Sequence, residues 1–180
     1  NGQRLWASLL AMAEIGATAR GGSCRLALSD EDRAGRELFA HWCTEAGMTL
    51  SVDPIGNLFA RRPGSDPHAA PVRMGSHLDT QPTGGKFDGA LGVIAGLEVM
   101  RSIHDLNIVT EAPIELVNWT DEEGSRFGHS LMGSGVWAGI YTHEKAYGLR
   151  DVDGVSVGDA LDAIGYKGPH KAAPFPADAY

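Results

Sequence analysis

The stretch that decides the fold is residues 113–124, with the sequence PIELVNWTDEEG. Residues 113–119 carry isoleucine, leucine, valine and tryptophan, which indicates a buried strand because branched and aromatic side chains are enriched in strands. This strand leads directly into Asp121, Glu122 and Glu123. The stretch therefore predicts a strand that delivers several carboxylates to one edge of a sheet.

A second strand of the same kind precedes it. Val72, Met74 and their neighbours predict a short buried strand ending at Gly75. The glycine-rich run GSHLDTQPTGGKFDG follows over residues 75–89, and a helix is expected over residues 89–104. Gly92 and Gly96 on that helix would allow close packing on a sheet. Both polar runs thus begin at the carboxyl ends of strands, where ligands sit in α/β sheets.

The remaining periodicities predict alternating helices and strands. One apolar stripe is expected on a first helix, ending near Gly16, and another on a second helix, capped by Ser29 and closed by Gly47. The stripes consist of Leu5, Trp6, Leu9, Leu10 and Ala13, and of Leu38, Trp42 and Ala46. Short strands are expected at 48–52 and 57–60, and short helices at 133–140, 143–147 and 157–164. The pattern predicts an α/β sheet covered by helices.

Composition narrows the function classes. The net charge of −8 argues against a nucleic-acid partner, which would require a basic face. No apolar run approaches the roughly 20 residues that a membrane span requires. Cys24 and Cys43 could form one disulfide, but two free buried thiols are the favoured prediction. The 24 glycines are nearly twice the usual share of roughly 7%, and their clustering indicates tight loops close to a ligand.

The two polar runs supply the donors of a metal site. His77 could ligate a metal, and Asp79 could orient its imidazole through the other ring nitrogen. Asp88 could bridge two cations. Of Glu122 and Glu123, one could ligate while the other handles protons, and a nearby cation would keep both ionised.

Each motif alone has a plainer interpretation: a hydrogen-bonded loop histidine, a solvated helix start or a turn. Their conjunction at two strand ends favours a site. Other glycine-rich interpretations fail in detail, because Phe87 follows Lys86 where a phosphate-binding loop needs serine or threonine. Dinucleotide-binding spacing is absent at Gly89, Gly92 and Gly96, as is a nucleophile elbow at Ser130 and Ser134.

A family resemblance covers residues 75–98 and 113–139. The phrases QPTGGKFDG at 81–89, VNWT at 117–120 and MGSGV at 132–136 resemble the M20 metallohydrolases, in their branch of N-carbamoyl-L-amino-acid hydrolases (L-carbamoylases) and β-ureidopropionases. Allantoate amidohydrolases are close relatives within it. The phrases IGAT at 15–18 and DPIGNLFAR at 53–61 also fit.

The resemblance implies a role for each chemical residue. His77 would ligate one metal, Asp88 would bridge both metals, and Glu123 would ligate the other. Glu122 would be the general base, and Asp79 would support His77. The implied cofactors are two divalent ions, with zinc, manganese, cobalt and nickel all admissible.

Gln81 and His129 are weaker candidates for contacting the substrate. The other histidines are expected to have no part in the chemistry. We expect His41 to be structural, His104 to suit a helix C-terminus, His68 and His143 to be solvated, and His170 to lie in a surface loop.

The resemblance also implies a wider architecture. Residues 1–180 would be the N-terminal part of a zinc-exopeptidase-like catalytic domain, with a mixed sheet flanked by helices. The rest of that domain, and a smaller dimerisation and lid domain, would lie outside these residues, so they would be inactive alone. The complete protein would be a cytoplasmic homodimer. Residues 167–180, with three prolines, would be a connection.

The expected reaction is hydrolysis of the carbamoyl amide of N-carbamoyl-L-amino acids, giving amino acid, ammonia and carbon dioxide. β-Ureidopropionase or allantoate amidohydrolase activity is the alternative, followed by an M20 aminoacylase or exopeptidase. A non-catalytic binding module would be expected to lose a ligand or the base, yet His77, Asp88, Glu122 and Glu123 are all present. The sequence does not choose among the ureido substrates or among the metals.

Overall fold

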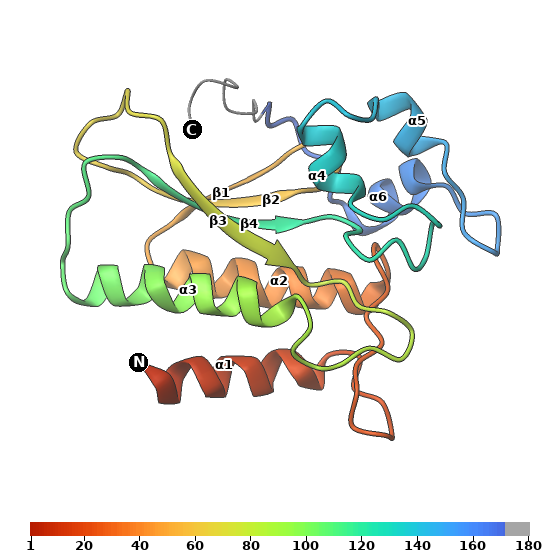
Figure 1. Ribbon diagram of the computed structural model, residues 1–180, viewed down its shortest axis with the longest axis horizontal. Coiled ribbons are helices and arrows are strands. Elements are labelled where there is room, and N and C mark those ends of the chain that lie inside the picture. The colour runs from red at the N-terminus through yellow and green to blue at the C-terminus, as the bar shows by residue number, and fades with distance from the viewer. Residues whose placement is uncertain (172–180) are drawn as a thin grey trace.

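A four-stranded mixed sheet forms the centre of the computed structural model, which describes residues 1–171 (Figure 1). The strands are β1 (Thr49–Val52), β2 (Leu58–Arg62), β3 (Val72–His77) and β4 (Ile114–Trp119), in the spatial order β1-β2-β4-β3. β2 runs antiparallel to β1 and β4, whereas β3 runs parallel to β4. The mixed sheet flanked by helices is thus confirmed. Of the expected connection at 167–180, residues 172–180 lie outside the described part.

Helices cover the sheet on two sides. The long ones are α1 (Gly2–Glu14), α2 (Asp30–Glu45) and α3 (Ala90–Asp105), and the short ones are α4 (Met132–Trp137), α5 (His143–Tyr147) and α6 (Val157–Ile164). α2 contacts β1 and β2, α3 contacts β3 and β4, and α1 packs on α3. Figure 1 shows these three below the sheet and the short helices above its right-hand end, where the arrowheads of β3 and β4 point.

Glycines on α3 bring that helix close to the sheet, as the sequence predicted. A side chain at Gly96 would meet Leu116 of β4, and one at Gly92 would meet the side chain of Ser76 on β3. The close approach buries Val93, Ile94 and Leu97 completely. It also places the start of α3 against β3, so residues 78–89 leave the strand and return to it before the helix begins.

The expected apolar stripes need correction. On α1, Leu9 and Ala13 are buried, but Trp6 and Leu10 are about half exposed at 52% and 40%. On α2 the innermost face carries Asp32, Gly35, Arg36, Phe39 and Cys43, and the expected Leu38 and Trp42 lie beside it, partly buried. The stripe was misplaced because an ion pair occupies the buried face, and apolar periodicity does not detect charges.

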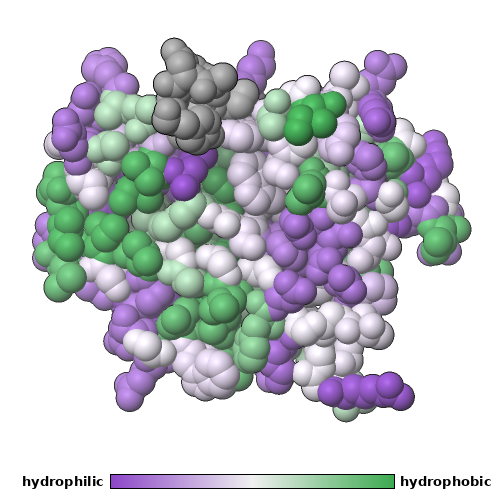
Figure 2. All heavy atoms as spheres, viewed as in Figure 1, coloured by the Kyte–Doolittle hydropathy of each residue, from purple (hydrophilic) through white to green (hydrophobic). Residues whose placement is uncertain are grey.

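Some hydrophobic side chains remain on the surface. Figure 2 shows hydrophobic residues gathered over the left and lower parts of the molecule, where Figure 1 places α3 and α1. The exposed ones on these helices include Trp6, Leu91 and Val99. Among the described residues, no helix combines the length and the hydropathy needed to cross a bilayer.

The two cysteines are free, as expected. Cys43 is fully buried, and burial raises the pKa of its thiol to about 12. Cys24 is only half-buried, so the prediction of burial is wrong for that residue.

The histidines expected to be inert fall into different settings. His104 lies in the last turn of α3, and His68 and His143 are exposed, as predicted. His41 is not structural: its side chain is 65% exposed and faces Glu45. His170 is half-buried and packs against Phe59 with the two rings tilted, so it is more than a surface loop residue.

Candidate metal centre

The candidate site forms where β3 and β4 end side by side. Because the strands are parallel and His77 is in register with Trp119, the segments that follow them leave the sheet at the same edge. Ligand atoms of His77, Asp88 and Glu123 all lie within 4.8 Å of one another. His77 is buried, Glu123 half-buried and Asp88 exposed, so the cluster opens towards solvent.

The imidazole of His77 is oriented for ligation. Its Nδ1 atom lies 2.9 Å from the main-chain oxygen of Asp79, which can only accept a hydrogen bond, so Nδ1 carries the proton. Nε2 then presents its lone pair on the side where Glu122 lies, 3.2 Å away. A lone pair among carboxylates is repulsive unless a cation lies between them, and one imidazole with two carboxylates suits a divalent transition metal. The donor set therefore fits the implied metal.

Gly89 makes the approach of Asp88 to His77 possible. Its φ of +63° lies in the left-handed region that favours glycine. A Cβ at this position would overlap the imidazole ring of His77. The chain can therefore turn from Asp88 into α3 across the face of the ring only because residue 89 lacks a side chain.

Asp79 contacts both halves of the site. Its carboxylate accepts hydrogen bonds from the main-chain N–H groups of Glu122 and Glu123, at 3.3 and 3.2 Å. The carboxylate also lies 3.8 Å from Nδ1 of His77, but the close contact to that nitrogen is made by the carbonyl instead. Asp79 is thus placed to hold the glutamate pair as well as the imidazole. Burial raises the pKa of Asp79 to about 6.

The two weaker candidates occupy different positions. Gln81 donates a hydrogen bond from Nε2 to Oε2 of Glu123, at 3.0 Å, so its amide restrains a carboxylate of the metal cluster. His129 packs edge-on against Tyr141, with ring centroids 4.5 Å apart. Among the described contacts, none joins His129 to the three clustered ligands.

Beneath the site lie buried charged residues whose role could not be identified from the sequence. Arg36 and Asp32 form an ion pair of 2.9 Å with neither side chain exposed. Arg25, also fully buried, donates to the main-chain oxygens of Leu78 and Ile15 at 2.6 and 2.8 Å. Because Leu78 separates His77 from Asp79, Arg25 holds the turn that carries both.

Asp121 is a further buried charged residue, to which the sequence alone assigned no separate role. It is fully buried with a φ of +50°, and within the described chain neither carboxylate oxygen has a hydrogen-bond partner. Burial, together with the negative charge of Asp79, raises its pKa to about 8. The available signal was the position of Asp121 beside Glu122 and Glu123; for Arg36 it was the spacing of four residues from Asp32.

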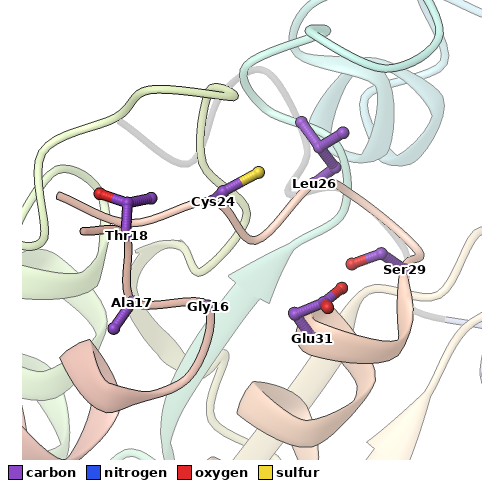
Figure 3. A pocket seen from close by; sticks show the side chains of 7 residues that line it. All are labelled: Gly16, Ala17, Thr18, Cys24, Leu26, Ser29 and Glu31. Carbon is purple, nitrogen blue, oxygen red and sulfur yellow. The ribbon is translucent and has the colours of Figure 1, made fainter. Parts of the chain in front are cut away.

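A pocket of about 270 Å³ lies in the N-terminal loops (Figure 3). The residues that line it are Gly16, Ala17, Thr18, Cys24, Leu26, Ser29 and Glu31. Its walls neighbour the glycine-rich loop, because Ser23 and Gly84 exchange main-chain hydrogen bonds. None of its lining residues belongs to the candidate metal cluster.

Comparison with known proteins places these features in a family. Residues 74–169 match Peptidase family M20/M25/M40, a span that contains all three clustered ligands. The N-carbamoyl-L-amino-acid amidohydrolase of Rhizobium meliloti is 52% identical over 180 residues, which are 100% of this chain and 43% of that protein. The allantoate amidohydrolase of Bacillus subtilis is 32% identical over 90% of this chain and 40% of its own length.

A solved structure agrees with these relatives. A hydantoinase/carbamoylase family amidase from Burkholderia ambifaria superposes with a TM-score of 0.95 at 56% identity, covering 97% of this chain and 43% of that one. The chain thus spans less than half the length of the relatives it matches.

Proposed function

From the premise that the chain belongs to Peptidase family M20/M25/M40, we propose that the complete protein hydrolyses the carbamoyl amide of N-carbamoyl-L-amino acids. The observation that carries the proposal is the convergence of His77, Asp88 and Glu123 within 4.8 Å, with Glu122 beside them. The names of similar proteins support the substrate class, since N-carbamoyl-L-amino-acid amidohydrolases recur among them.

Three side chains would hold the cofactor. His77 would ligate one divalent ion, Asp88 would bridge two ions, and Glu123 would ligate the second. Bound cations would polarise the substrate carbonyl and lower the pKa of water. Zinc, manganese, cobalt and nickel all suit such carboxylate-rich sites. The main-chain contact of His77 with Asp79 and the amide of Gln81 on Glu123 would orient two of the ligands.

Glu122 would move the proton. Its carboxylate takes a proton from the attacking water, whose oxygen forms a bond to the ureido carbonyl carbon. The bond from that carbon to the amino-acid nitrogen then breaks, and Glu122 returns the proton to the departing nitrogen. Carbamic acid, the other product, decomposes to ammonia and carbon dioxide. The hydrogen bonds from the main-chain N–H groups of Glu122 and Glu123 to the carboxylate of Asp79 support this role, because these bonds fix the backbone that carries Glu122.

A substrate panel tests the proposal. The complete protein, loaded with zinc, manganese, cobalt or nickel in turn, would be assayed with an N-carbamoyl-L-amino acid, 3-ureidopropionate, allantoate, an N-acetylamino acid and a dipeptide. We expect the highest kcat/KM for the N-carbamoyl-L-amino acid, with release of ammonia. A preference for allantoate or 3-ureidopropionate would change the proposed substrate but would still support an amidohydrolase. Hydrolysis of only the acetyl or peptide substrate would refute the carbamoyl proposal.

We further propose that the complete protein acts as a homodimer in the cytoplasm on small ureido acids, without a nucleic-acid or membrane partner. The acidic charge of −8 supports the absence of nucleic acid, and the family resemblance supports the dimer. Sedimentation of the complete protein would test the oligomeric state. A monomer at assay concentration would contradict the dimer without affecting the proposed chemistry.

A further inference from the structure

We propose that Asn57 is a positioning residue that sets the location of Glu122 and Glu123, and that Asp53 orients its amide. Asn57 directly precedes β2 and has no exposed surface. It belongs to the run DPIGN at 53–57, which the metal chemistry does not use. The inference rests on the proposed function, because it concerns the loop that carries the proposed base and one ligand.

The amide of Asn57 is inserted between two main-chain segments. Its Oδ1 accepts a hydrogen bond from the N–H of Thr120 at 3.0 Å, and its Nδ2 donates to the carbonyl oxygen of Gly133 at 3.0 Å. Beside this bridge, the N–H of Gly133 donates directly to the carbonyl of Thr120 at 2.8 Å. Thr120 and Gly133 therefore share one direct main-chain hydrogen bond, and the side chain of Asn57 takes the place of a second one. The side chain thus sets the separation of the two segments.

Asp53 determines which way the amide points. Its Oδ2 accepts from Nδ2 of Asn57 at 2.8 Å, and its Oδ1 accepts from the N–H groups of Ile55 and Asn57 at 3.1 and 2.8 Å. A carboxylate can only accept, so the NH₂ end of the amide must face Asp53. The oxygen end is thereby directed to Thr120. No other orientation of the amide satisfies all its partners.

The bridge lies at the start of residues 120–123, which follow β4 and are called the catalytic loop below. Thr120 is its first residue, and Asp121, Glu122 and Glu123 come next. Glu122 is held by the same segment at the start of α4, because the N–H of Leu131 donates to the carbonyl of Glu122 at 2.7 Å. A change in the separation at Thr120 would therefore be transmitted to both glutamates. Small displacements of such groups affect catalysis strongly.

Asn118 offers a matched control. It is the same residue type, is also fully buried, and lies on β4 two residues before Thr120. Within the described chain, neither atom of its amide has a hydrogen-bond partner. Substitution of Asn118 therefore changes the packing of a buried strand without removing a bond to the catalytic loop.

The test compares Asn57→Ala, Asp53→Asn and Asn118→Ala in the complete protein. Cobalt(II) titration, followed by visible absorption and calorimetry, reports ligand geometry and affinity, and turnover and melting temperature are measured on the same samples. We expect Asn57→Ala to weaken cobalt affinity and lower kcat by about 10–100-fold, as outer partners of metal sites do. The absorption bands should shift as well. Asp53→Asn no longer fixes the orientation of the Asn57 amide. It should change cobalt affinity, kcat and the absorption bands in the same direction, but by less.

The control should lower the melting temperature while the spectrum, affinity and kcat stay at wild-type values. If Asn57→Ala and Asp53→Asn lower only the melting temperature, as Asn118→Ala does, Asn57 is merely structural and the inference is wrong. If Asn57→Ala does not fold, the spectrum of Asp53→Asn decides. A wild-type protein that binds cobalt but cleaves no carbamoyl substrate would refute the proposed function, whereas the cobalt spectra would still test the positioning.

Discussion

The carboxyl edge of the sheet and the contact of α1 with α3 are built on opposite principles. Beneath the edge, several charged side chains are fully buried, and some have several partners: Arg36 contacts Asp32, Thr120 and the carbonyl of Gly56. Between α1 and α3, side chains such as Met12 join an apolar core, and the charged contact of Arg4 with Glu98 is only part-buried.

The difference between the two regions separates the contacts that fix the positions of site residues from the contacts that stabilise the fold. Apolar contacts are non-directional and tolerate small shifts, so they can hold a helix on a sheet without fixing an atom. Hydrogen bonds to buried charges are directional and costly to break, so they fix the places of His77 and the glutamates. Substitutions at the edge should therefore alter metal binding or turnover, whereas substitutions at the α1–α3 contact should alter stability alone.

The largest effect is expected within the edge, from two neighbouring residues. Glu122→Gln in the complete protein should lower kcat by about 10²–10⁴-fold, because it removes a general acid–base group. Cobalt affinity should stay near the wild-type value. Glu123→Gln should instead weaken cobalt binding, since it changes a proposed ligand. Steady-state kinetics and calorimetry on both variants make the measurement, with exposed Glu144→Gln as a neutral control.

Near-normal turnover in Glu122→Gln would show that Glu122 is not the general base. If Glu122→Gln loses cobalt and Glu123→Gln retains it, Glu122 is the metal ligand and Glu123 the candidate base.

The second prediction tests whether the edge depends on backbone shape. Gly89→Ala should weaken cobalt binding by about 10–100-fold, because the methyl group would overlap the His77 ring at a φ of +63°. Gly85→Ala lies in the same loop, with nothing within 4 Å of the added methyl, and should bind cobalt normally. Equal affinities in the two variants, measured by calorimetry, would show that the approach of Asp88 to His77 does not require glycine.

The comparison also explains what the sequence could predict. The expected helices and strands lie within a few residues of the observed ones. Periodicity reports apolar burial, which fits β4, but the expectation of a buried strand at β3 is wrong, because Val72 is 60% exposed and most of β3 is not fully buried. The two strand ends predicted that His77, Asp88 and the pair of Glu122 and Glu123 lie close together, whereas the family resemblance alone selected Glu123 as the ligand. The direction of Asp79 was not, since a residue two positions after a histidine can approach it through either its carboxylate or its carbonyl.

The buried support of the edge was harder to predict. Arg25 and Arg36 resemble solvated charges in the sequence, and only the packing of distant segments shows their partners, at Leu78 and Thr120. The role of Asn57 has the same origin, because its partners Thr120 and Gly133 lie more than sixty residues away. Polar groups that are satisfied over long range leave no local pattern.

The third prediction contrasts a buried with an exposed ion pair on one helix. Arg36→Met leaves Asp32 buried and unpaired, which should lower the free energy of unfolding by about 3–5 kcal/mol. Arg33→Met breaks the exposed pair with Glu37 and should lower the free energy of unfolding far less, because water and salt screen an exposed pair. Both pairs lie on α2 with the same spacing, so urea unfolding of the two variants isolates burial. Similar costs would show that the edge is no more sensitive than the surface.

The smallest effect is expected at the α1–α3 contact, as a dependence of stability on pH. Hydrogen bonds from Arg4 lower the pKa of Glu98 to about 2, from an ordinary value of 4.5. Since the folded pKa is lowered, the carboxylate stabilises the fold above pH 4.5, and this contribution is lost as the pH falls towards 2.

Glu98→Gln should therefore flatten the decline in melting temperature between pH 5 and pH 2.5, and Glu37→Gln, in an exposed pair, should change it less. The measurement uses metal-free protein, so that ligand protonation does not contribute. At pH 7, cobalt affinity of Glu98→Gln should match that of the wild type, because Glu98 joins helices and no described contact links it to the metal ligands. A weakened cobalt affinity would show that α3 transmits displacement to Asp88, and the separation between position and stability would then fail.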